Sequence, residues 1–287
     1  MEKKEFDIEN VENAWCPGCG NFGLKNIMME VFAELELKKE NFVMVSGIGQ
    51  AAKSPQYYDV SYFNGLHGRA LPAAAGIKAA NPGLAVIVQS GDGDMYGEGG
   101  NHFIHAIRRN PDITVIVHDN MVYGLTKGQA APTSQKGMKT PIQIDGVFEE
   151  PINPLSLAIS LDASFVARGS VGEKELTKAI IKEAVKHKGF SLVDVFQACV
   201  SFNKINTHKW FKENTYVMED GRDLKNREEA FKKALESSPW PLGIFYKNED
   251  KDVFEEKLAP YAEGDKTPLY ARERGGDVAA ALLKEKK

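Results

Sequence analysis

The sequence predicts an α/β protein built on a doubly wound parallel sheet, the fold class in which strands and helices alternate along the chain. Short apolar runs rich in Val and Ile recur through its first two thirds, and each is followed by Gly, Ser, Asp or Asn. Such runs are typical of buried parallel strands. We predict strands at 42–45, 84–88, 113–117, 165–167 and 192–196. In this fold class ligands bind beyond the carboxyl ends of the strands.

Helical segments separate these strands, which is the second observation behind the fold class. We predict helices at 24–37, 70–80, 102–109 and 173–187. In the last of these, Leu176, Ile180, Ile181 and Val185 fall on one face, as expected of a helix that packs on a sheet. The alternation therefore predicts right-handed crossover connections between neighbouring strands.

The character of the chain changes after about Ser201, where polar and aromatic residues become frequent. A charged helix at 222–236 and one more strand at 240–247 are expected there. We divide the chain into a main domain over 1–205, which includes an N-terminal CxxC segment, and a C-terminal extension over 206–287. The extension is expected to pack as an arm on the domain or on a partner subunit.

Composition excludes several classes of protein. The 287 residues carry 36 basic and 40 acidic side chains, a net charge of −4, without a basic block that could follow a phosphate backbone. Nucleic acid is therefore not an expected partner. No apolar run approaches the roughly 20 residues needed to span a bilayer, and the N-terminal stretch is too polar for a secretory signal. We expect a cytoplasmic protein with no membrane partner.

Two strand ends carry residues suited to a metal and a diphosphate. The run LAVIVQS leads into GDGDMYGEGGN, and ITVIVHD leads into NMVYGLTKGQ, so that Asn120 follows Asp92 by 28 residues. That is one strand–helix–strand crossover, which brings both side chains to the same edge of the sheet. Oxygen ligands of this kind suit Mg²⁺, and Gly91 and Gly93 let backbone amides approach a diphosphate. Gly-Asp-Gly alone is also a common turn, but its pairing with Asn120 favours the metal site.

These residues resemble the thiamine diphosphate motif, in which the Asp, the Asn and a carbonyl two residues beyond the Asn hold Mg²⁺. The corresponding positions are Asp92, Asn120 and Val122. The resemblance narrows further, because roughly residues 13–205 look like the β subunit of the 2-oxoacid:ferredoxin oxidoreductases. The blocks that carry it, in order, are WCPGCGN, SGIG, HGRALPAAAGIKAANP, GDGD, GGNHFIHAIRRN and DNMVYGLTKGQAAPTS.

The resemblance implies a set of cofactor contacts from the loops at the strand ends. Thiamine diphosphate and Mg²⁺ would be bound by Gly47, Ile48, Gly49, His67, Gly68, Gly91, Asp92, Gly93, Asp94, Asn120, Val122, Gly124, Leu125 and Thr126. It also implies two catalytic positions. Lys53 would anchor the carboxylate of the 2-oxoacid, because an ammonium group suits a carboxylate, and Leu125 would border the substrate chain.

Enzymes of this family decarboxylate a 2-oxoacid, transfer the acyl group to coenzyme A and pass electrons through iron–sulfur clusters to ferredoxin. The resemblance therefore implies ferredoxin, a 2-oxoacid and coenzyme A as partners and substrates, and an α subunit of the same enzyme. In this family the glutamate that faces the aminopyrimidine comes from the α subunit. The chain would then form half of an active site.

Three cysteines match three of the four positions that bind a [4Fe–4S] cluster in two-subunit members of the family. They are Cys16, Cys19 and Cys199, and the remaining position is Gln50. An amide is a poor ligand for an iron–sulfur cluster. Three outcomes stay open: a cluster with a weak or external fourth ligand, a labile cluster, or no cluster, with electrons leaving through another subunit.

Three alternatives compete with this interpretation. A dinucleotide-binding dehydrogenase could use SGIGQAAKS as its glycine-rich turn, although the third glycine is missing and GDGD stays unexplained. A non-redox thiamine diphosphate-dependent decarboxylase or synthase subunit would explain the diphosphate loop but not WCPGCG. A zinc-stabilised interaction module would need a fourth ligand that three cysteines do not supply.

Overall fold

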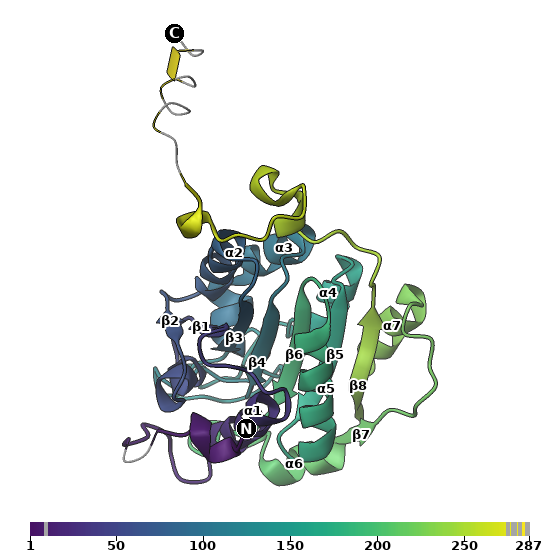
Figure 1. Ribbon diagram of the computed structural model, residues 1–287. Helices are drawn as coiled ribbons and strands as arrows, with labels where there is room; N and C mark the ends of the chain where they lie inside the picture. The colour runs from purple at the N-terminus through teal and green to yellow at the C-terminus, as the bar shows by residue number, and fades with distance from the viewer. Residues whose placement is uncertain (9–10, 274–275, 277–279, 281–282, 285–287) are drawn as a thin grey trace.

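A single mixed sheet of eight strands runs through the protein (Figure 1). The computed structural model describes residues 1–8, 11–273, 276, 280 and 283–284. The sheet order is β2-β1-β3-β4-β6-β5-β8-β7. The strands are β1 (Phe42–Ser46), β2 (Tyr62–Asn64), β3 (Ala85–Gly91), β4 (Thr114–Asp119), β5 (Phe165–Ser170), β6 (Ser191–Phe196), β7 (Thr215–Val217) and β8 (Trp240–Lys247).

The strands from β2 to β5 in this order are all parallel, which confirms the predicted doubly wound sheet. The predicted strand at 240–247 is present as β8, but it runs antiparallel to β5. The short β7 pairs with β8 in the parallel sense and ends the sheet. An antiparallel edge on an otherwise parallel sheet is common in α/β proteins.

Helices cover both faces of the sheet. They are α1 (Gly20–Glu34), α2 (Ala70–Ala80), α3 (Gly100–Arg109), α4 (Pro154–Ser160), α5 (Lys174–Lys186), α6 (His208–Asn214) and α7 (Arg227–Ala234). A π-helical turn spans Gly93–Glu98. Short 3₁₀ helices span Lys3–Phe6, Ala51–Tyr57, Glu255–Lys257, Ala259–Tyr261 and Leu269–Ala271.

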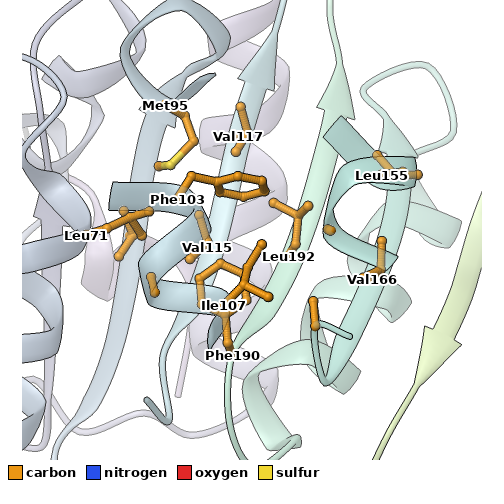
Figure 2. Packing of buried hydrophobic residues seen from close by; sticks show 14 of the residues in the cluster. Leu71, Met95, Phe103, Ile107, Val115, Val117, Leu155, Val166, Phe190 and Leu192 are labelled. Atoms are coloured by element: carbon orange, nitrogen blue, oxygen red, sulfur yellow. The ribbon is translucent and has the colours of Figure 1, made fainter. Parts of the chain in front are cut away.

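Two large apolar cores lie between these helices and the sheet. Helices α1 and α5 share one core with alternate strand residues such as Ile87, whereas α2, α3, α4 and α7 share the other with residues such as Val88. In the second core, Phe103 and Ile107 of α3 point toward the sheet (Figure 2). Helix α5 lies on the opposite face of the sheet from α4. The chain passes from β4 over β6 to β5 and then steps back to β6, so these two connections run in opposite directions across the sheet. Right-handed crossovers in opposite directions place their helices on opposite faces.

The C-terminal extension enlarges the sheet. It contributes β7 and β8. Its helix α7 packs against α4 in the core that these helices share with α2 and α3. The predicted charged helix at 222–236 is shorter, and α6 was not predicted. The elements α4, β2 and β7 were not predicted either, because elements of three to seven residues are too short for a periodic pattern. The domain boundary at 205 stays a prediction.

Among the residues described, no helix is both long enough and apolar enough to cross a lipid bilayer.

Candidate functional site

A cavity opens at the carboxyl ends of β1, β3 and β4, where this fold class binds its ligands. It is lined by Ile48, Gly49, Gln50, Ala51, His67, Gly91, Asp92, Gly93, Asp94, Asn120, Val122, Tyr123, Gly124, Leu125 and Thr126. Every predicted cofactor residue lines it except Gly47 and Gly68. The structure therefore brings these loops together, and the cofactor contacts themselves stay a prediction.

The two predicted metal ligands leave neighbouring strands. In the register of β3 and β4, Gly91 lies opposite His118, so Asp92 and Asn120 follow directly at adjacent strand ends. Both residues line the same cavity. The spacing of 28 residues is thus one crossover, as predicted from the sequence.

The turn that carries Asn120 is held in an unusual conformation. Met121 adopts a left-handed backbone with φ of 57°, which is uncommon for a residue other than glycine. Its N–H donates to Oδ1 of Asp119 over 3.1 Å, and its carbonyl accepts from the Ser134 hydroxyl over 2.6 Å. The N–H of Val122 donates to Oδ1 of Asn120 over 3.0 Å. Across the residues that the structure covers, no hydrogen bond uses the Val122 carbonyl, the third predicted ligand.

Asp92 lies in a buried cluster of negative charge. Its side chain is 2% exposed and accepts a hydrogen bond from the Thr133 hydroxyl. Burial, and then the charge of Asp194, raises the pKa of Asp92, and burial with the neighbouring carboxylates raises the pKa of Asp119. The charge of Arg168 opposes this pKa shift at Asp119 and Asp194, and its Nε lies 3.5 Å from Asp194. A divalent cation at Asp92 would compensate the remaining negative charge, so the residues present fit Mg²⁺.

Asp94 has a different environment from Asp92, because both oxygens of its carboxylate accept hydrogen bonds from nearby backbone and side-chain groups. Its Oδ1 accepts hydrogen bonds from the N–H of Ile48 over 3.0 Å and of Gly68 over 2.7 Å, and it lies 2.5 Å from Nδ1 of His67. The Ser90 hydroxyl donates to Oδ2. Asp94 therefore ties the loops after β1 and before α2 to the loop after β3.

Two glycines allow this close approach. A Cβ atom on Gly47 would lie 2.0 Å from Oδ2 of Asp94. Gly68 has φ of 70°, and a Cβ there would lie 2.4 Å from the backbone carbon of Glu98. Neither glycine lines the cavity, but both allow the loops around it to pack closely together.

The segment after Asp92 also differs from the sequence prediction. The sequence predicts a helix at 102–109. Helix α3 begins earlier, and the π-helical turn Gly93–Glu98 lies between it and Asp92. The Tyr123 hydroxyl donates to Glu98 over 3.0 Å, which connects this turn to the loop after β4. π-Helical turns are rare in proteins, and those that occur are often found at functional sites.

The two predicted catalytic positions differ in their placement. Leu125 lines the cavity with 38% of its surface exposed. Lys53 lies half-buried in the 3₁₀ helix Ala51–Tyr57 and does not line the cavity. The structure of this chain thus does not bring Lys53 to the site, and its contact with substrate stays a prediction.

Cys16 and Cys199 both lie near enough to Cys19 to interact with it electrostatically. Burial, with a smaller contribution from the charges of Cys199 and Cys16, raises the pKa of Cys19 to about 11. Within the described part of the chain, no group of three or more His, Cys, Asp or Glu side chains could hold a metal ion. Gln50 lines the cavity at the strand ends. The donor set therefore does not fit a cluster held by four side chains of this chain, and we assign no electron-transfer step to it.

Sequence reasoning missed the residues that support the loops carrying Asp92 and Asn120. Besides Thr133 and Ser134, Asn203 donates from Nδ2 to the Asn120 carbonyl over 3.0 Å. Thr133 and Ser134 fall inside the AAPTS block quoted above, but nothing local indicated their partners. Asn203 is 83 residues from Asn120 and has no sequence signal at all.

Comparison with known proteins is consistent with a thiamine diphosphate site in this cavity. Residues 43–195 match the family model described as thiamine pyrophosphate enzyme, C-terminal TPP binding domain. Residues 199–263 match the family model for the C-terminal part of the pyruvate ferredoxin oxidoreductase beta subunit. The first match spans the strand ends that carry Asp92 and Asn120.

Curated proteins and a solved structure are similar over most of the chain. A 2-oxoacid:ferredoxin oxidoreductase subunit beta from Sulfolobus sp is 45% identical over 260 residues, which cover 86% of this chain and 85% of that protein. The 2-oxoglutarate synthase subunit KorB of Archaeoglobus fulgidus is 37% identical, and the alignment covers 92% of this chain and 93% of that protein.

The structure of 2-oxoglutarate:ferredoxin oxidoreductase from Magnetococcus marinus, with 2-oxoglutarate, coenzyme A and succinyl-CoA bound, aligns with a TM-score of 0.91 at 33% identity. The alignment covers 99% of this chain and 96% of that one. These matches leave the dehydrogenase and zinc-module alternatives without support.

Proposed function

Because this chain belongs to the β subunits of the 2-oxoacid:ferredoxin oxidoreductases, we propose that it provides the Mg²⁺ and diphosphate half of a thiamine diphosphate active site. The reaction is the oxidative decarboxylation of a 2-oxoacid to acyl-CoA and CO₂, with ferredoxin as the proposed electron acceptor. The observation that carries the proposal is the placement of Asp92 and Asn120 at adjacent strand ends on one cavity.

The chain's own residues have defined tasks in this proposal. Asp92, Asn120 and the Val122 carbonyl hold Mg²⁺, and the backbone at Gly91 and Gly93 approaches the diphosphate. When bound, thiamine diphosphate supplies the carbanion chemistry that releases CO₂ from the 2-oxoacid. Leu125 borders the substrate and excludes water from that side of the cavity.

The proposal needs a second subunit. Of the acidic residues that line the cavity, Asp92 is the proposed metal ligand, and Asp94 holds the surrounding loops. In line with the family resemblance, we assign the glutamate that faces the aminopyrimidine to the α subunit. Exposed apolar side chains in the loop after β4, at Ile142, Ile144 and Phe148, offer a surface on which a partner could pack.

The proposal is tested with the complex of this chain and its α partner. Mg²⁺ and thiamine diphosphate together should raise its melting temperature, and neither should do so alone to the same extent. The complex should then turn over one or more members of a 2-oxoacid panel, with coenzyme A and a low-potential electron acceptor. Absence of both stabilisation and turnover would refute the proposed function.

The iron–sulfur cluster is a separate proposal with an incomplete donor set. Cys16, Cys19 and Cys199 are free cysteines that would each have to lose a proton to bind iron, and a fourth ligand would have to come from outside these side chains. Iron and sulfide analysis of the anaerobically purified complex, with an EPR spectrum after reduction, tests it. Absence of iron from this chain in the complex would exclude the cluster.

A further inference from the structure

The side chain of Gln50 is a polar group of the cavity that none of the roles above uses. Gln50 follows β1 and lies just before the 3₁₀ helix Ala51–Tyr57. It lines the same cavity as Asp92, Asn120 and Leu125. It is the position that the resemblance assigned to a metal ligand, yet it borders the cofactor cavity.

The backbone of Gln50 is firmly held. The indole N–H of Trp15 donates to the Gln50 carbonyl over 2.8 Å. Trp15 is 6% exposed and packs edge-on against Phe22 and Tyr57, with ring centroids 5.1 Å and 4.8 Å away. The Gln50 side chain therefore extends from a fixed point on the cavity wall.

The amide oxygen of Gln50 has no hydrogen-bond partner among the residues that the structure describes. This Oε1 atom is buried, and an unpaired buried amide oxygen is costly. The Cγ of Gln50 lies 3.9 Å from the place where a Cβ on Gly124 would be, so the side chain runs beside the turn that leads to Leu125. Rotation of the terminal torsion exchanges the oxygen and the N–H₂ of the amide, so this unpartnered amide end can turn its N–H₂ toward an acceptor atom in the adjoining cavity.

We propose that Gln50 binds the 2-oxoacid, with its amide N–H₂ donating to the carboxylate and keto oxygens next to the bond that is cleaved. This inference rests on the proposed function and names one further substrate-contacting residue of that site. A neutral amide suits this task because it can donate or accept after rotation of its terminal torsion. The amide also adds no charge beside the proposed metal site. Lys53, the predicted carboxylate anchor, does not line the cavity.

Three variants of the complex test the proposal. Gln50→Met keeps the length of the side chain and removes its hydrogen bonds. Gln50→Glu keeps its shape and places a negative charge toward the substrate carboxylate. Gln56→Met is the matched control, because Gln56 lies on the neighbouring 3₁₀ helix and is exposed.

Two affinities are measured for each variant. One is the affinity for thiamine diphosphate with Mg²⁺, and the other is that of the cofactor-loaded complex for a 2-oxoacid, taken as KM and as the Kd of its acylphosphonate analogue. We expect Gln50→Met to weaken substrate and analogue binding by about 10-fold to 100-fold, as for a hydrogen bond to a charged group. Gln50→Glu should weaken them further, and cofactor affinity should change less than about twofold.

Several results would overturn the inference. An unchanged KM and analogue Kd in Gln50→Met would show that the amide does not contact substrate. An equal loss of cofactor affinity would assign Gln50 to the cofactor instead. A matching effect in Gln56→Met would point to a general structural disturbance. If the unaltered complex neither binds the cofactor nor turns over a 2-oxoacid, the proposed function fails first, and the two failures are distinguishable.

Discussion

Nδ1 of His67 lies 2.5 Å from Oδ1 of Asp94, and this contact joins the loop before α2 to the loop after β3. The same oxygen accepts the N–H groups of Ile48 and Gly68. Asp94 is 3% exposed, and its hydrogen bond from the N–H of Gly68 is buried, so this donor would lack a partner if the carboxylate were lost. One buried side chain thus holds three walls of the cofactor cavity in place.

Asp94→Asn should weaken both the fold and cofactor binding. The amide offers one acceptor oxygen instead of two, so buried donors stay unpaired, and we expect the free energy of unfolding to fall by about 3 kcal/mol. Urea unfolding and a titration with Mg²⁺ and thiamine diphosphate measure the two effects. Glu98→Gln is the control, because Glu98 contacts the exposed side of His67 over 3.5 Å and should cost less than about 1 kcal/mol. Equal effects of both changes would contradict the assigned role of Asp94.

Asp92→Ala should abolish Mg²⁺-dependent cofactor binding and leave the fold intact. In the absence of metal, the Asp92 carboxylate is buried among other carboxylates, so its removal should cost the apo protein little stability. At 100 times its Kd the cofactor should stabilise the unaltered complex by about 2.7 kcal/mol, and this gain should vanish in the variant. Thermal unfolding with and without cofactor measures the difference. Unchanged turnover would remove Asp92 from the metal site.

Lys78→Met should destabilise the protein without changing its catalytic constants. Lys78 is buried near the start of β3, at the end away from the cavity, with Nζ 2.9 Å from Asp112 and 2.9 Å from the Leu84 carbonyl. Its removal leaves Asp112 without its buried partner, which should cost about 3 kcal/mol. Lys188→Met is the matched control, because Lys188 binds the same carboxylate from a side chain that is 72% exposed. It should cost less than about 1 kcal/mol in urea unfolding.

Glu34→Gln should show a stability difference that depends on pH. Lys182 and then Lys178, both on α5, hydrogen-bond to Glu34 at the end of α1 and lower its pKa from 4.5. A carboxyl with a lowered folded pKa stabilises the fold above its unfolded pKa and loses that effect as pH falls through the folded value.

We therefore expect the free energy of unfolding of the unaltered chain to exceed that of Glu34→Gln by about 0.5 kcal/mol at neutral pH. The difference is small because solvent screens the ion pair. The difference should vanish in strongly acidic solution and shrink in high salt. Urea unfolding across a pH series measures it. A difference that persists below the folded pKa of Glu34 would contradict the ion-pair origin.

Two glycine substitutions should have opposite effects. Gly68→Ala places a Cβ 2.4 Å from the Glu98 backbone at a φ of 70°, so the loop must shift and cofactor binding should weaken at least about tenfold. Gly76→Ala lies on α2, where an added Cβ meets no atom within 4 Å. It should stabilise the helix by about 1 kcal/mol and leave cofactor affinity unchanged. Thermal unfolding and cofactor titration distinguish the two, and similar outcomes would contradict the packing at Gly68.

Much of the fold could be predicted because its signals are local. The apolar runs that became β1, β3, β4, β5 and β6 are continuous, and strand ends rich in Gly and Asp mark where they stop. The helix over Lys174–Lys186 was predicted from the one-sided placement of Ile180 and Ile181, both of which lie in a core. The antiparallel direction of β8 could not be predicted, because strand direction depends on the path of the preceding loop and not on the residues of the strand.

For the candidate site too, local sequence patterns predicted one part and the folded chain was needed for the rest. The shared sheet edge of Asp92 and Asn120 could be read from the residues alone, because one crossover connects two adjacent parallel strands and fixes their spacing. The folded chain was needed to see that Asp94 holds loops together, that Thr133 and Asn203 hydrogen-bond to Asp92 and Asn120, and that Gln50 lines the cavity. These contacts join residues that are far apart along the chain. They depend on how the loops pack above the sheet, which no local pattern encodes.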